Sequence, residues 1–123
     1  MKPFDIEITS ISKGPDELTY QLPISAKIIK QIPGKDRPDY FIAKLEKSIV
    51  WVNKSDSENK EISHIVLCSK KKNQDVSKDM KGVIIAIAYI LHDSVLTDSK
   101  LNFKKCKYIA VGTASAVKKW GLF

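Results

Sequence analysis

The sequence has few of the residues, and none of the motifs, that usually identify a function. It contains two cysteines and a single arginine, Arg37, and its longest apolar run, residues 83–91, has nine residues. A membrane-spanning helix needs about 20 apolar residues, so this run is too short to form one. Two cysteines can form one disulfide at most, which excludes a disulfide-stabilised scaffold. We find no catalytic or nucleotide-binding motif and no resemblance to a known family.

The size and composition predict one globular domain that spans residues 1–123. The chain is 43% hydrophobic and 28% charged, close to the averages of globular proteins, which excludes collagen-like, coiled-coil and wholly disordered chains. The first residues lack the apolar stretch of a secretory signal, so we expect a cytoplasmic protein. In that reducing compartment Cys68 and Cys106 are expected to stay reduced, and Cys68, inside an apolar segment, to be buried.

Alternation of apolar and polar residues predicts strands for most of the chain. The segment 18–28 is read as one long strand or two collinear strands, and the segment after residue 41 is expected to bend at Lys47 and Ser48. The polar turn at 53–60 predicts a hairpin. The predicted strands cover residues 4–11, 18–28, 41–52, 62–69, 83–91 and 107–113.

The run at 83–91 could be a central strand or a buried helix, and its isoleucines favour the strand. Ile85, Ile87 and Leu91 would then be core residues, and the opposite face, with Ala86 and Ala88, would offer small residues on which another segment can pack. The polar residues 70–81 predict a long loop. Residues 93–105 predict a connector with one helical turn.

A short helix is predicted at 114–120, capped by Thr113 and ended by Gly121. The predicted fold class is therefore α+β and mostly β: a small antiparallel barrel or sandwich of about six strands with a short C-terminal helix.

Candidate catalytic and metal-binding residues are sparse. His64, Cys68, His92 and Cys106 could in principle bind zinc or form a Cys–His nucleophilic pair, but they lack the close ligand pairs of structural zinc sites. Asp93 ends an apolar strand and is better explained as a turn residue. Residues 112–115 could hold an anion at a helix N-terminus, but ordinary capping explains them better. We expect no metal and no cofactor, and an enzyme is the third hypothesis, after a binding module and a nucleic-acid-binding barrel.

The net charge of +7 raises the alternative of nucleic-acid binding. The excess lies in residues 61–123, which carry net +6 against +1 for residues 1–60. Twenty of the 21 basic residues are lysines, whereas base and phosphate recognition favours arginine. A solvated lysine-rich face is thus the simpler reading. The residues of the alternative nucleic-acid surface are Lys70, Lys71, Lys72, Lys104, Lys105, Lys107 and Tyr108.

From these patterns we expect a non-enzymatic binding module. It would act through a sheet face or an exposed strand edge on a protein partner or on its own copy, as a homo-oligomer. The alternative is a β-barrel that binds single-stranded nucleic acid through the C-terminal lysines, and no membrane partner is expected.

Overall fold

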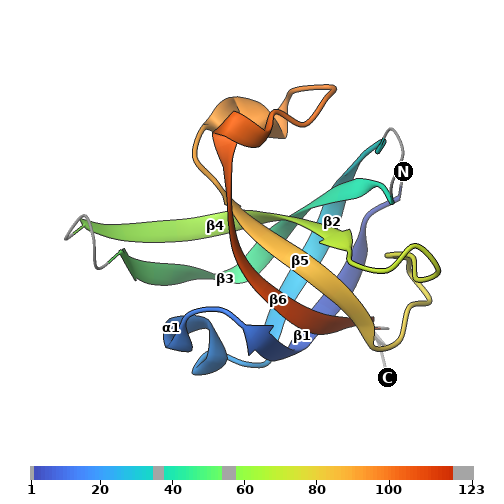
Figure 1. The fold of residues 1–123 in the computed structure, drawn as a ribbon, viewed down its shortest axis with the longest axis horizontal. Coiled ribbons are helices and arrows are strands. Elements are labelled where there is room, and N and C mark those ends of the chain that lie inside the picture. Colours follow the sequence, from blue (N-terminus) through green and yellow to red (C-terminus); the bar gives the residue numbers. More distant parts are fainter. Residues whose placement is uncertain (1, 35–37, 54–57, 118–123) are drawn as a thin grey trace, which may run out of the picture.

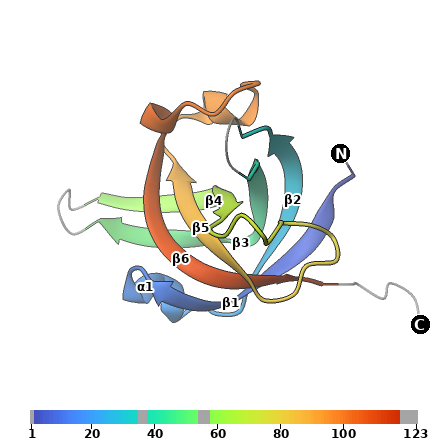
Figure 2. The same ribbon diagram turned by 45° about the vertical axis from the view of Figure 1, so that its right-hand side comes forward.

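The computed structural model describes residues 2–34, 38–53 and 58–117. Each strand in these ranges is antiparallel to the next, and the last strand pairs with the first, so that the sheet closes into a barrel (Figure 1, Figure 2). None of the helices in these ranges has the length and apolar composition of a membrane span. The elements are β1 (Phe4–Lys13), α1 (Asp16–Thr19), β2 (Ile24–Ile32), β3 (Tyr40–Asn53), β4 (Glu58–Ser69), β5 (Val83–Ile90), η1 (Asp93–Leu96), η2 (Phe103–Lys105) and β6 (Cys106–Ala116), where η marks a 3-10 helix.

The pairing of β6 with β1 decides between a barrel and a sandwich, the two architectures that the sequence pattern allowed. Ile8 lies opposite Ala114, and Ile6 lies opposite Ala116, so the first and last strands join directly. The prediction of a mostly antiparallel β fold is confirmed, and the fold is a closed barrel rather than a sandwich.

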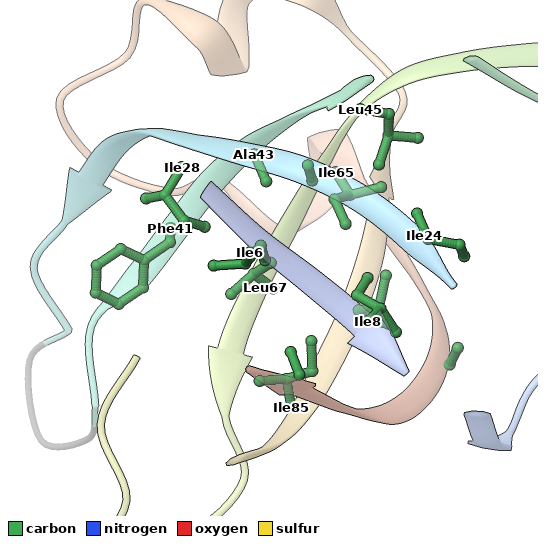
Figure 3. Close-up of a cluster of buried hydrophobic side chains, with 14 of the residues drawn as sticks. Ile6, Ile8, Ile24, Ile28, Phe41, Ala43, Leu45, Ile65, Leu67 and Ile85 are labelled. Atoms are coloured by element: carbon green, nitrogen blue, oxygen red, sulfur yellow. The ribbon is translucent and has the colours of Figure 1, made fainter. Parts of the chain in front are cut away.

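Alternate residues of the six strands fill the barrel interior, as expected from the alternation of the sequence (Figure 3). The connections close both ends. Leu18 of α1 enters the core at the end where β1 joins β2, and Val76 and Met80 of the β4–β5 loop enter it at the opposite end. The predicted long loop at 70–81 therefore contributes to the core instead of lying wholly in solvent.

A second apolar cluster lies on the outside of the barrel. Val95 of η1 is buried against Ile42 and Val66, and the partly buried Ala86 and Ala88 of β5 belong to the same cluster. The small residues on this face of β5 do support a packed segment, as the sequence predicted. That segment is the connector that contains η1 and η2.

The predicted C-terminal helix is wrong over the part of it that is described. Residues 112–116 belong to β6, where Ala114 pairs with both Val83 and Ile8, and Ser115 accepts a hydrogen bond from the N–H of Gly82 at 2.9 Å. Pairing on both sides outweighs the local capping signal at Thr113, and no helix N-terminus exists there to hold an anion. Residues 118–120 of the predicted helix lie outside the described residues.

Two further predictions at strand ends are corrected. Residues 18–22 are not strand, because Pro15 starts the short helix α1, and β2 begins only at Ile24. Leu91 is not a core residue: β5 ends at Ile90, and the Leu91 side chain is 47% exposed. Ile85 and Ile87 are buried as predicted.

Both cysteines carry free thiols, and Cys68 is buried as predicted. Burial also raises the pKa of the half-buried Cys106, which lowers the fraction of reactive thiolate. We therefore expect slow reaction of the native protein with a thiol reagent, slowest at Cys68, and fast reaction of both thiols in denaturant. Mass spectrometry of the labelled peptides measures each rate. Rapid labelling of Cys68 in the native protein would contradict this burial.

Candidate functional site

One cavity among the described residues lies in the barrel interior. It is lined by Leu18, Ile49, Ile62 and other core residues and has a volume of only about 10 Å³. That volume is about the space needed for one water molecule. A larger groove lies on the outside of the barrel, beside β4.

The most distinctive outer feature is the long hairpin of β3 and β4. The β2–β3 ladder ends at Leu45, and the β4–β5 ladder begins at Ile65, whereas β3 and β4 continue to pair with each other from Ile49 opposite Ile62 to Asn53 opposite Glu58. We call residues 46–53 and 58–63 the arm. It projects from the barrel as a two-stranded ribbon (Figure 1, Figure 2).

An irregularity at the base separates the arm from the barrel. Lys44 pairs with His64, and the next pair joins Ile49 to Ile62, so four residues of β3 lie opposite one residue of β4. Such a bulge bends the strands and increases their twist. The bend predicted at Lys47 and Ser48 lies within this irregularity.

The arm has a buried base and open edges. Ile49 and Ile62 are buried in the barrel core, whereas Val50 on β3 is 54% exposed. Ser48 donates a hydrogen bond to the carboxylate of Glu61 at 2.7 Å, which links the two strands at the base. Among the described residues, the main chain at 46–53 and 58–63 is paired in a ladder only across the hairpin. Each strand therefore presents one row of N–H and C=O groups away from its partner.

A groove runs beside the open edge of β4. It has a volume of about 300 Å³ and lies between residues 61–64 of β4, residues 89–91 at the end of β5, and Asp93 and Leu96 of η1. The groove exists because β5 stops at Ile90. There the chain turns into η1, where His92 Nδ1 accepts a hydrogen bond from the N–H of Ser94 at 3.2 Å.

The charged groups of the groove are mainly acidic. Glu61 and Asp93 bring carboxylates, and His64 is the titratable base among the lining residues. Partial burial and the charge of Lys44 lower the pKa of His64, although Asp93 acts in the opposite direction. His64 is thus mostly uncharged at neutral pH, and the groove keeps a negative character.

The lowered pKa of His64 predicts a pH dependence of stability. The folded protein binds the imidazole proton less readily than the unfolded chain, whose histidine has the ordinary pKa of 6.5. His64 therefore makes its full contribution above that pH, and the contribution falls as the pH drops through 6.5 toward the folded pKa. Denaturant unfolding of the wild type and of His64→Gln between about pH 5 and about pH 8 should show a smaller loss in the variant. An equal loss would contradict the assignment.

The structure splits the lysines predicted for nucleic-acid binding into two groups. Lys70 donates its N–H to the carbonyl of Ile84 near one end of β5, whereas Lys107 pairs with Tyr89 near the other end. The two points are about 17 Å apart along the strand. Lys70, Lys71 and Lys72 thus follow one end of the β4–β5 ladder, whereas Lys104, Lys105, Lys107 and Tyr108 lie near the other end of β5.

Lys105 has a structural role within the second group. Its ammonium group donates to Ser94 Oγ at 2.7 Å and to Asp98 Oδ2 at 3.0 Å. Lys30 donates to the carbonyl oxygens of Leu96 and Asp98 at 3.2 and 2.6 Å. Lys30 of β2 thus holds the connector against the barrel. The bonds of Lys105 lie within the connector, and they leave its ammonium group less available for an external phosphate.

The rest of the second group is open to solvent. Tyr108 is 54% exposed, and Lys104 and Lys107 are exposed. Phe103 of η2 is 64% exposed and contacts Tyr40 edge to face, with ring centroids 5.5 Å apart. Two aromatic side chains and two lysines of η2 and the start of β6 are thus exposed.

Sequence reasoning missed the arm and its groove. The apolar run at 49–52 beside a polar turn was visible as a hairpin, but its projection depends on where the β2 and β5 ladders end. Asp93 was treated as a turn residue, and it does begin η1 beside the groove. No three His, Cys, Asp or Glu residues gather as metal ligands in the described part of the chain.

The chain was compared with protein-family models, with curated proteins and with solved structures. None of the three comparisons produced a match.

Proposed function

We propose that the protein is a non-enzymatic interaction module that binds another protein chain, either a partner or a second copy, through the β3–β4 arm. The observation that carries the proposal is the pair of ladder ends at Leu45 and Ile65, beyond which the arm is paired only with itself in the described part of the chain. An open strand edge is a template for another strand, because main-chain hydrogen bonds form with little regard to sequence.

The composition of the arm supports this proposal. Proteins usually protect an exposed edge with lysine, proline or a bulge. The bulge here lies at the base of the arm, and residues 49–52 of β3, Ile-Val-Trp-Val, have neither a charge nor a proline, whereas β4 carries Glu58, Lys60 and Glu61. A two-stranded ribbon is also only marginally stable by itself in water. An added strand would therefore stabilise the arm.

The arm extends past both neighbouring ladders. β1 and β6 pair with each other over residues 6–13 and 111–116, whereas residues 106–110 of β6 pair only with β5 in the described ladders. Among the described residues, the cavity in the barrel interior has a volume of only about 10 Å³ and an apolar lining.

Sedimentation of the purified chain over a range of concentrations tests the proposal. Val50→Lys places a charge on the arm and is expected to weaken association by about tenfold. Tyr20→Lys is the matched control, because Tyr20 is an exposed apolar residue outside the arm, in the segment after α1. It should associate as the wild type does. Identical sedimentation of all three chains at every concentration would contradict self-association through the arm.

Binding of single-stranded nucleic acid is a second candidate function, which the exposure of Phe103 and Tyr108 beside Lys104 and Lys107 favours. Aromatic faces stack bases while lysines contact phosphates. Affinity for an oligonucleotide should then fall with log salt at a slope of about −0.7 per phosphate contact. Tyr108→Ala should cost about 1–3 kcal/mol of binding.

The control for this second candidate uses the two groups of lysines. Lys104→Gln with Lys107→Gln should flatten the salt slope, whereas Lys70→Gln with Lys71→Gln, near the other end of β5, should not. Lys105 is left unchanged because it is paired with Asp98 within the connector. Binding that disappears near physiological ionic strength would reject this function.

A further inference from the structure

We infer that the arm binds its partner in the groove beside β4. The bound part of the partner is an extended, basic segment, which is added as a strand next to β4. The inference rests on the proposed function, because it assumes that the arm binds another chain.

The shape of the groove fits a strand. β4 runs from Glu58 to Ser69, but its ladder with β5 covers only Ile65–Ser69. The groove occupies the position beside residues 61–64 that β5 would fill if it continued past Ile90. A strand laid there would extend the sheet in the direction in which β5 ends, and it would meet the open main-chain groups of β4.

The floor and ends of the groove also suit a strand with alternating side chains. Tyr89, Ile90 and Leu91 line one side, and the exposed Leu91 adds apolar surface next to Leu96 of η1. Successive side chains of a strand point to opposite sides, so one set would contact this apolar surface and the other set would point toward solvent and the charged rim.

Charge selects a basic partner. The groove carries Glu61 and Asp93, while His64 is kept mostly neutral, in part by the charge of Lys44, and the whole chain has a net charge of +7. The two carboxylates attract a cationic peptide to the groove, whereas the net charge of the chain opposes its approach elsewhere. An anionic peptide would show the reverse preference. Because the protein as a whole is strongly basic, binding of a cationic strand to it therefore indicates binding at the groove.

The test uses the full chain and two synthetic hexapeptides, Lys-Val-Lys-Val-Lys-Val and Glu-Val-Glu-Val-Glu-Val, both blocked at their ends. Amide chemical shifts in NMR report where each peptide binds. We expect the lysine peptide to shift the signals of residues 61–64 and 89–91, and the glutamate peptide to leave them unchanged. Binding of the lysine peptide elsewhere, or no binding at all, would overturn the inference.

Variants separate charge attraction from strand addition. Glu61→Gln with Asp93→Asn should weaken the lysine peptide about threefold to tenfold, as expected for two partly exposed charge pairs. Asp16→Asn with Asp79→Asn removes two exposed carboxylates elsewhere and should have no effect. A lysine peptide with N-methyl groups on alternate residues keeps its charge but loses main-chain donors. It should bind more weakly, and equal binding would reject strand addition.

The two levels of the proposal can fail separately. If the lysine peptide does not bind but Val50→Lys still weakens association, the arm binds protein by another surface and the groove inference is wrong. If the peptide binds in the groove but sedimentation is insensitive to Val50→Lys, the groove inference stands and self-association through β3 is rejected.

Discussion

Replacing Ile85 with alanine is expected to lower the free energy of unfolding by about 2–5 kcal/mol. The Ile85 side chain is 0% exposed and belongs to the core inside the barrel, where the inward side chains of all six strands meet (Figure 3). Truncation removes buried apolar surface and leaves a cavity that the surrounding strands cannot close. Denaturant unfolding, with the slope held common to both proteins, measures the difference.

Leu91→Ala is the matched control for Ile85→Ala. Both residues were predicted as core positions of one strand, but Leu91 lies past the end of β5 and is largely exposed. Its truncation should cost less than about 1 kcal/mol. Similar losses for the two variants would contradict the placement of the end of β5.

Gly112→Ala is expected to destabilise the protein by about 1–3 kcal/mol or more, although the change adds one methyl group. A β-carbon at Gly112 would lie 2.5 Å from the main-chain oxygen of Ser10 and 3.1 Å from the Ile11 side chain. β1 and β6 approach closely at this point, between two irregularities in their register. The methyl group would therefore push apart the two strands that close the barrel.

Gly82→Ala is a control that separates the steric effect at Gly112 from the conformational cost of replacing a glycine. A β-carbon at Gly82 meets no atom within 4 Å, but the residue has φ of 58°. Alanine there should cost about 1–2 kcal/mol from backbone conformation alone. Thermal unfolding of both variants compares the two causes. A Gly112→Ala variant as stable as the wild type would show that β1 and β6 do not approach as described.

Much of the fold could be predicted because the strand pattern is local. In β5, residues 83, 85, 87 and 89 are buried, and residues 84, 86, 88 and 90 are partly buried, as the alternation indicated. Residues 86, 88 and 90 pack with the connector. The C-terminal helix failed for a non-local reason. Ser115 and Ala116 form ladder pairs with β1, more than 100 positions earlier in the chain. The local sequence around Thr113, which predicted a helix cap, cannot indicate such a distant pairing.

The sequence predicted the kind of candidate site, an exposed strand edge, but not its position in the fold. An exposed edge was expected on general grounds, but the arm is defined by where the neighbouring ladders stop. The lysines were grouped by their positions in the sequence. In space, Lys70 and Lys107 lie near opposite ends of β5, and Lys105 is paired with Asp98.

Amide hydrogen exchange of the full chain, measured at low and at high protein concentration and with the lysine peptide, tests most directly whether the arm is an open docking element. In the dilute protein we expect slow exchange in the barrel ladders and fast exchange at alternate amides of residues 46–53 and 58–63. Added chain or peptide should slow exchange at those amides and leave the barrel unchanged. Slow exchange throughout the arm in the dilute protein, or arm exchange that neither higher concentration nor peptide changes, would contradict the account.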